Sequence, residues 1–193
     1  MSYNQNLTRK ELAQKVDREK ILFLSLFWFL AMITSATAFA NYPAYLNGDR
    51  NFILVDGHMG VAWYVDRSSL KVKQYLPPHY IITIEVVSAE SAINDVNDFY
   101  SGGRGIITGR KLYHFAYHWD SKHMYLGDDS DYGAADWKYV DPRGSWADTG
   151  IIMPAGEMAF ALAYNMKFYG TLTIRYSDGT TYPVYSDDFY SRI

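Results

Sequence analysis

Short apolar runs separated by turn-forming residues fill most of the chain beyond residue 50, and this pattern predicts antiparallel β-strands. Residues 52–55 and 58–65 are apolar and flank Asp56 and Gly57. An Asp-Gly pair between two such runs favours a tight hairpin turn, because both residues tolerate a positive φ angle. Residues 66–69 (DRSS) supply a local turn that should end the second strand. Residues 80–88, rich in β-branched side chains, predict the clearest strand.

The second half of the chain continues this pattern. Residues 111–120 alternate, so that the aromatic residues at 113, 115, 117 and 119 share one face of a strand. Leu112, His114, Ala116 and His118 share the other face. Ser121 and Lys122 predict a turn into a strand at 123–126, and a further strand is expected at 137–140. Residues 171–176 and 181–185 predict a third hairpin.

One long helix is predicted, over residues 154–169. Pro154 suits the first helical position, Glu157 suits the positive end of the helix dipole, and Gly170 suits the position after the last turn. A shorter helix is expected around residues 91–100, within a polar segment. The pattern therefore predicts an α+β fold: a mainly antiparallel sheet of about five to seven strands, with one helix from the C-terminal half packed on it.

The first forty residues differ from the rest and are typical of an export signal. A polar lead with five basic residues precedes an uncharged apolar run over 21–33 and the small-residue tail TSATAFA, in which Ala38 and Ala40 suit a signal-peptidase site. The sequence predicts a signal peptide over 1–40, followed by a single domain over 41–193. Retention of residues 21–40 as an uncleaved membrane anchor is the alternative, because this segment carries no charge.

Charge and cysteine content narrow the partners of the expected domain. The chain has 18 Lys and Arg against 21 Asp and Glu, and the lead holds 5 and 3 of these, which leaves 13 against 18. This acidic balance without a basic cluster argues against nucleic acid as a partner. The chain contains no cysteine, so the domain must fold without disulfides and cannot carry a thiol-linked lipid anchor. We expect a protein or an envelope polymer as partner, and contact with the membrane only through residues 21–40 if these are retained.

Histidines and an acidic segment are the candidate ligands for a metal ion. His114 and His118 lie on one face of the expected strand but about 13 Å apart, which is too far to share an ion directly. His123, across the expected turn, could approach His118. Asp129, Asp131 and Gly133 resemble the start of a calcium loop, and Asp136 is a further candidate ligand, although Val140 stands where the closing glutamate is expected. The favoured prediction is therefore no metal and no cofactor, with a weak calcium loop as the alternative.

No motif for a catalytic nucleophile is present: the chain has no Gly-x-Ser-x-Gly, no His-Glu-x-x-His and no phosphate loop. Glu157 could act as an acid or base with a histidine, but a stabilising role near the helix start is favoured. The sequence accordingly names no catalytic residue.

Three segments carry a resemblance to known proteins: residues 56–70 (DGHMGVAWYVDRSSL), 141–147 (DPRGSWA) and 153–170 (MPAGEMAFALAYNMKFYG). Together they resemble an uncharacterised group of small exported bacterial proteins. The order of strands and tyrosine-rich segments is more distantly similar to the surface-adhesin protein E family, which implies a sheet-and-helix fold at the cell surface and binding of host proteins. That family commonly has cysteines and a lipid-attachment site, and this chain has neither.

The sequence thus predicts an exported, non-catalytic protein of the periplasm, the cell envelope or the secreted fraction, with an adhesin-like binding or structural role. The alternative is an envelope-polymer hydrolase with a carboxylate and histidine site. A pocket in which Glu157 converges with His114 or His118 would favour the hydrolase.

Overall fold

Strands dominate the computed structural model of this chain, which describes residues 42–127, 137–175 and 179–193. The strands are Phe52–His58 (β1), Val61–Leu76 (β2), His79–Ser91 (β3), Gly105–His118 (β4), His123–Gly127 (β5), Lys138–Val140 (β6), Thr173–Arg175 (β7) and Thr181–Pro183 (β8). The helices are Val96–Tyr100 (α2), Trp146–Thr149 (α3), Ile152–Tyr164 (α4) and Asp187–Tyr190 (α5), with 3-10 turns at Leu46–Gly48 (η1) and Tyr169–Thr171 (η2).

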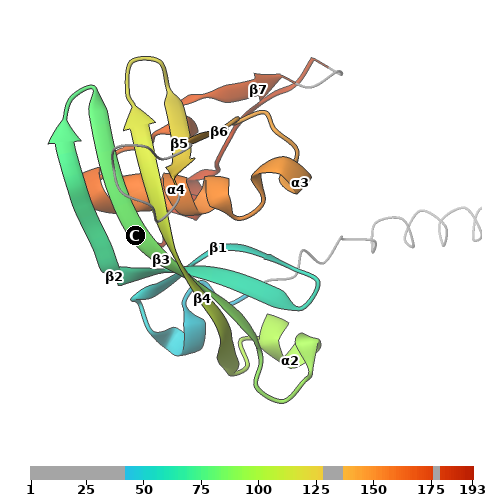
Figure 1. The fold of residues 1–193 in the computed structure, drawn as a ribbon. Helices are drawn as coiled ribbons and strands as arrows, with labels where there is room; N and C mark the ends of the chain where they lie inside the picture. The colour runs from blue at the N-terminus through green and yellow to red at the C-terminus, as the bar shows by residue number, and fades with distance from the viewer. Residues whose placement is uncertain (1–41, 128–136, 176–178) are drawn as a thin grey trace, which may run out of the picture. The chain divides into compact units, whose positions relative to one another are not determined.

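Six strands form one antiparallel sheet in which β1 to β6 are neighbours in chain order (Figure 1). The two short strands β7 and β8 pair with each other in a second sheet. This architecture confirms the predicted α+β class, the antiparallel pairing and the number of strands. It follows from a chain of hairpins, because short connections place consecutive strands side by side.

Helix α4 packs against one face of the sheet, where alternate strand residues form the larger core. Gly156 makes the close approach possible, because a Cβ at this position would collide with Met124 and lie 3.0 Å from the ring of Phe115. The hydroxyl of Tyr117 donates to the Gly156 carbonyl at 2.8 Å. Phe160, from the next turn of α4, packs on Tyr117 with ring centroids 4.9 Å apart. The alternating aromatic residues of β4 therefore face the core, as predicted.

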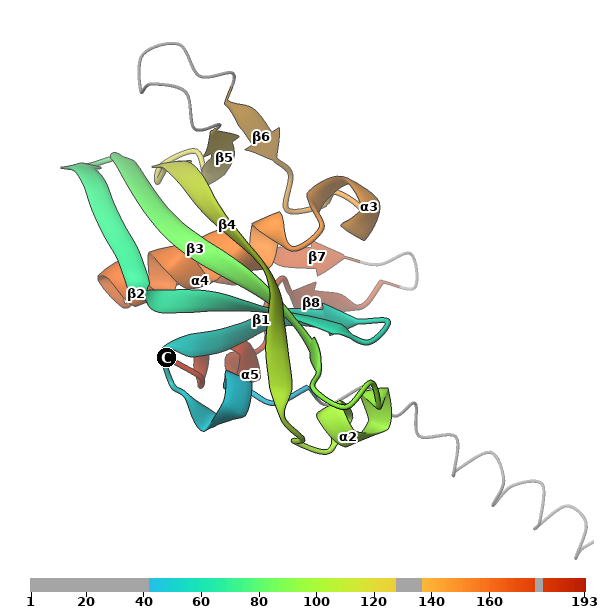
Figure 2. The ribbon, with the colours of Figure 1, turned by 60° about the horizontal axis from the view of Figure 1, so that its bottom comes forward.

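A second, smaller core lies at the other end of β3 and β4, under η1 and α2 (Figure 2). Tyr64 and Val87 are fully buried there beside Phe99 of α2. Asp95 caps α2 by accepting hydrogen bonds from the backbone N–H groups of Asn97 and Asp98. The two cores lie on opposite faces of the sheet, since Val86 belongs to the larger core and Val87, the next residue of β3, to the smaller one.

The first hairpin turns at Met59 and Gly60, and the predicted turn at Asp56 and Gly57 was wrong. Met59 and Gly60 have φ angles of 51° and 88°, whereas Asp56 and Gly57 lie inside β1 and pair with β2. Gly57 serves packing instead, because a Cβ there would collide with the ring of Tyr42. Position 57 does require a glycine, but the reason is the close contact with Tyr42 and not a turn.

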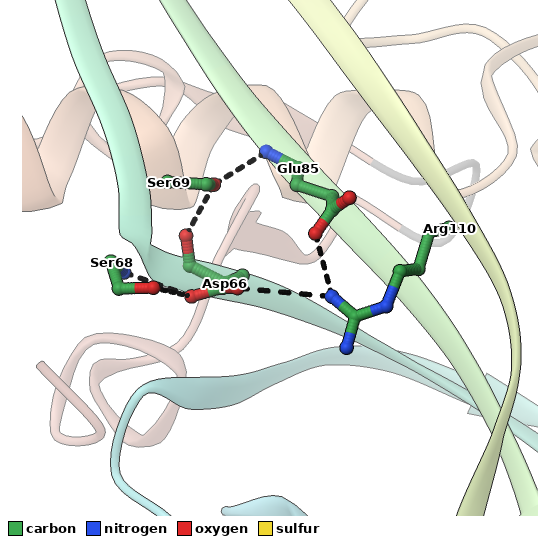
Figure 3. A network of polar contacts seen from close by, with 5 residues as sticks. All are labelled: Asp66, Ser68, Ser69, Glu85 and Arg110. Atoms are coloured by element: carbon green, nitrogen blue, oxygen red, sulfur yellow. Dashed lines mark hydrogen bonds and ion pairs between the residues drawn. The ribbon is translucent and has the colours of Figure 1, made fainter.

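The predicted strand end at residues 66–69 is a bulge, after which β2 continues to Leu76. The pairing with β3 jumps from Asp66 opposite Glu85 to Lys71 opposite Thr83. The Ser69 hydroxyl bridges the gap: it donates to the Asp66 carbonyl at 2.6 Å and accepts from the Glu85 N–H at 2.7 Å (Figure 3). Polar side chains thus replace ladder hydrogen bonds at this point.

Charged side chains brace the same bulge (Figure 3). Arg110 of β4 donates to Glu85 at 2.7 Å, and its Nη1 lies 4.0 Å from the buried carboxylate of Asp66. Asp66 also accepts from the backbone N–H and the hydroxyl of Ser68, at 2.9 and 2.6 Å. The DRSS segment was correctly predicted to make local side-chain hydrogen bonds, but these bend the strand without ending it.

The long helix is shorter than predicted and begins two residues earlier. It ends at Tyr164, and Asn165 follows in the left-handed conformation with a φ of 54°. Gly170 is not the cap; a Cβ there would collide with the Tyr190 hydroxyl. The helices α3 and α5 were not predicted, and α2 occupies only the second half of the expected 91–100 segment.

None of the helices in the described ranges is long and apolar enough to span a membrane. The predicted signal peptide at residues 1–40 lies outside the described residues.

Candidate functional site

Three histidines form a row across neighbouring strands, on the face of the sheet opposite α4. His79 of β3 pairs with His118 of β4, which pairs in turn with His123 of β5. We call these three residues the histidine row and this side of the sheet the outer face. The rings of His79 and His118 meet edge to face, with centroids 4.6 Å apart. Register explains the arrangement, since directly opposed residues on paired strands share a face.

The turn between β4 and β5 supplies a hydroxyl to the histidine row. The Ser121 N–H donates to Nδ1 of His118 at 3.2 Å, and the Ser121 hydroxyl lies 2.9 Å from the same nitrogen. Because a backbone N–H can only donate, Nδ1 is an acceptor, and the neutral ring carries its hydrogen on Nε2. The Ser121 hydroxyl therefore donates to His118 as well.

Lys122 holds this turn in place from the other side of the sheet. It adopts a φ of 53° and lays its ammonium over the ring of Trp119, at 2.9 Å from the ring centroid. Burial lowers the pKa of Lys122 below its ordinary value, against the opposing effect of Glu157. The backbone N–H of Trp119 also donates to the Pro78 carbonyl at 2.8 Å, which ties the turn to the neighbouring β2–β3 connection. Ser121 is thus presented by an anchored turn.

A hollow of about 530 Å³ lies over the outer face beside the histidine row. Ala116 is directly opposite Tyr125 across the β4–β5 pair, and its small side chain leaves room at the floor. Trp137 also lines the hollow, and its ring lies over Gly127, where a Cβ would come within 2.5 Å of it. The lining residues are His79, Ala116, Tyr117, His118, Ser121, His123, Tyr125 and Trp137. None of these described lining residues is an Asp, Glu, Lys or Arg.

Aromatic contacts extend the hollow towards β6. The ring of His123 meets that of Tyr139 edge to face at 4.9 Å, and Tyr125 lies 5.7 Å from Tyr139. The Tyr125 hydroxyl is 3.3 Å from Nδ1 of His123. Tyr139 is 41% exposed, so a ligand in the hollow could also reach this ring. The site offers flat rings and uncharged hydrogen-bonding groups side by side.

The predicted histidine positions agree in part with this site. His118 and His123 are direct cross-strand neighbours, as anticipated. His114 lies on the same face but opposite Gly127, four residues along the strand from His118. His79 was missed, because the Pro77-Pro78 break hid the start of β3. In the described part of the chain, no group of three His, Asp or Glu side chains is placed to hold a metal ion. The candidate calcium residues Asp129, Asp131 and Asp136 lie outside the described residues.

Glu157 is fully buried on the α4 side of the sheet and does not converge with the histidines of the outer face. Its Oε2 accepts from the Tyr169 N–H at 2.7 Å, and its Oε1 accepts from the N–H groups of Phe168 and Gly170, at 2.8 and 3.3 Å. The Tyr190 hydroxyl donates to Oε1 at 2.6 Å. Burial raises the pKa of Glu157, and these four donors oppose the rise.

The role of Glu157 therefore differs from the one that its position near a helix start suggested. Its carboxylate binds the backbone N–H groups around η2, which follows α4. A carboxylate with three backbone donors and a tyrosine hydroxyl is saturated, and it ties the C-terminal segment to the core. No sequence signal indicated this, because the donors are backbone groups that belong to no motif.

Comparisons of this chain with family models, with curated proteins and with solved structures find no match in any of the three.

Proposed function

We propose that this chain is an exported, non-catalytic binding domain of the cell envelope or the secreted fraction, and that the outer-face hollow holds a polymer of the envelope. The proposal for export is supported by the leader-like residues 1–40. The observation that carries the binding role is the lining of the hollow, in which rings, imidazoles and a hydroxyl surround a small floor residue, with no Asp, Glu, Lys or Arg among the described lining residues.

This lining suits an uncharged, hydroxyl-rich chain such as a glycan. Half-buried rings such as Tyr125 and Trp137 offer flat apolar surface, and His118 and Ser121 offer donors and acceptors at its margin. A strongly charged polymer would need opposite charges in the site, which the described lining residues do not provide.

The test is binding of neutral envelope oligosaccharides to the purified chain, followed by calorimetry and by tryptophan fluorescence. We expect Trp137→Ala and Tyr125→Ala each to weaken binding about tenfold, equivalent to about 1.4 kcal/mol. Gly127→Ala should weaken binding without removing a ring, because its new methyl group displaces Trp137. Tyr75→Ala is the control, since it removes an exposed ring on the opposite face of the sheet.

Equal affinity of the control and the hollow variants would refute the assignment of the hollow, as would a failure of every neutral oligosaccharide to bind. Export is tested separately, by N-terminal sequencing of the product outside the inner membrane. A start after Ala40 supports cleavage, and a start near Met1 in the membrane fraction supports the retained anchor. Full-length product free in the cytosol would end the export proposal.

A hydrolase acting on the same polymer is the second candidate, favoured by the contact between the Ser121 hydroxyl and His118 Nδ1. That contact has the length of a nucleophile–base pair. The carboxylate suggested by the sequence, Glu157, lies on the other face and cannot orient this histidine. Release of soluble fragments from purified envelope polymer, lost in Ser121→Ala with polymer binding retained, would replace the binding proposal with this one.

A further inference from the structure

Among the described residues, the far half of β2 forms an unpaired edge of the six-stranded sheet. β1 pairs with β2 only between His58 opposite Val61 and Phe52 opposite Asp66. Beyond the bulge, Lys71, Val72 and residues 74–76 pair with β3 on one side, with a second register shift at Lys73. Within the described part of the chain no strand pairs with their other side. In Figure 1, β2 and β3 extend beyond β1, and this part of β2 forms the open edge. Such an edge presents backbone N–H and C=O groups that a further strand can complete.

Apolar side chains are unusually exposed along this edge. Val72, Tyr75 and Leu76 are 46%, 65% and 62% exposed. Tyr75 leans on the rings of Tyr80 and Tyr164, each at a centroid distance of 5.6 Å, so it forms a supported ring at the margin of the α4 face. Leu76 pairs with His79 and therefore points to the outer face. An added strand would find apolar contacts on both faces.

The charges of the edge indicate what kind of strand fits. Lys71 and Lys73 are both exposed and flank Val72. Lysines on an edge strand oppose pairing with a second copy of the same edge, because like charges on facing strands repel. The same lysines attract a segment that carries carboxylates. The edge is thus protected against self-association and open to an acidic partner.

We propose that residues 71–76 of β2 bind an extended acidic segment of another protein as an added seventh strand. Backbone hydrogen bonds hold the segment, its carboxylates meet Lys71 and Lys73, and its apolar residues cover Val72 and Tyr75. This site is distinct from the hollow proposed for a polymer, and neither proposal depends on the other.

The test uses a fluorescent ten-residue peptide in which Glu alternates with Val, and a matched peptide with Lys in place of Glu. Fluorescence anisotropy with the full chain should show binding of the Glu peptide and at least tenfold weaker binding of the Lys peptide. Lys71→Glu and Lys73→Glu should each weaken binding of the Glu peptide about tenfold. Arg104→Glu is the control: it makes the same charge change at another exposed residue and should leave the affinity unchanged.

Hydrogen exchange locates the contact and guards against a variant that fails to fold. The backbone amides of residues 71–76 should exchange more slowly when the Glu peptide is bound to the unmodified chain. Absence of binding at 1 mM peptide, equal affinity for the Lys peptide, or protection at some other strand would each overturn the proposal. A dimer of the chain alone in which residues 71–76 become protected would overturn it in favour of a second copy.

Discussion

Glu157→Gln tests whether a buried carboxylate holds the C-terminal segment to the core. The substitution keeps the size of the side chain and one acceptor oxygen. Placed at the Oε1 position, that oxygen still accepts from Phe168, Gly170 and Tyr190, as Oε1 does in the native chain. The amide nitrogen then faces the Tyr169 N–H, whose native acceptor is Oε2 at 2.7 Å. Two donors meet, and one backbone N–H is left buried without a partner.

One orphaned buried donor sets the magnitude of the expected loss. Leaving such a group unpaired costs about 1–3 kcal/mol. For a domain of this size, each kcal/mol lowers the melting temperature by about 2–4 °C. We therefore expect Glu157→Gln to lower the free energy of unfolding by about 1–3 kcal/mol at neutral pH. Glu90→Gln, at an exposed site, should change it by less than about 0.5 kcal/mol.

The pH dependence gives a second check on the same group. Burial raises the pKa of Glu157 above 4.5, so the folded protein keeps this proton at pH values where the unfolded chain has released it. The stability that a raised pKa contributes is complete below the unfolded pKa and is lost as the pH rises through the folded pKa. The free energy of unfolding of the native chain should therefore fall as the pH rises from about 4.5, and Glu157→Gln, which has no proton to lose at this position, should lack this contribution.

Urea unfolding, followed by circular dichroism from pH 4 to pH 8, measures both effects. The slope of the free energy against urea should be the same for the native chain and both variants, because the same surface is exposed on unfolding. If Glu157→Gln is as stable as Glu90→Gln at every pH, the carboxylate is not what ties the 168–170 segment to α4, and the reasoning from its hydrogen bonds is wrong.

Two further substitutions test the packing and the bulge. Gly156→Ala should destabilise the protein by about 1–3 kcal/mol despite the better helix propensity of alanine, because its methyl group collides with Met124. Thermal unfolding measures the loss of stability, and Ala163→Gly, a substitution in the same helix that lacks this clash, is measured for comparison. Ser69→Ala should lower the free energy of unfolding by about 1–3 kcal/mol, because the Glu85 N–H loses its acceptor at the bulge. Ser101→Ala, at an exposed serine, is the control, and equal stability of the two variants would contradict the bridging role of Ser69.

The sequence was most informative where a pattern extends over many residues. The alternation in β4 placed Tyr113, Phe115 and Tyr117 on one face of the strand and His114 and His118 on the other. The structure agrees, and the first of these faces is the one in the core. Periodicity works here because a covered sheet face needs apolar residues at every second position. The fold class followed from the same signal, repeated from strand to strand.

Single-residue signals were less informative, because glycine has more than one use. Gly57 and Gly170 each lack a Cβ for a tertiary contact, with Tyr42 and Tyr190. The sequence favoured a turn and a helix cap at these positions, since local rules see only conformational freedom. The true cause lies in residues far along the chain, which a local pattern cannot contain.

Only part of the candidate site could be predicted from the sequence, because its other residues come from distant parts of the chain. His118 and His123 are close in sequence, so the hairpin that opposes them could be expected. His79 joins them only because β3 pairs with β4 in the register that places it opposite His118. Trp137 joins the hollow because Gly127 leaves space for its ring. The spacing of residues along the sequence does not by itself predict the register of distant strands or the space left for a side chain in the folded protein.

The composition of the hollow argues that this part of the outer face is built to be covered by something other than water. Around the bulge the outer face carries Asp66, Glu85 and Arg110, as a solvated sheet face usually does, whereas around Ala116 and Gly127 it carries rings. A face meant for a helix would instead need larger apolar residues at these two positions to fill the interface. Small residues between rings leave an open, uncharged hollow, and a ligand with flat, hydroxyl-bearing units satisfies that surface better than either water or a helix.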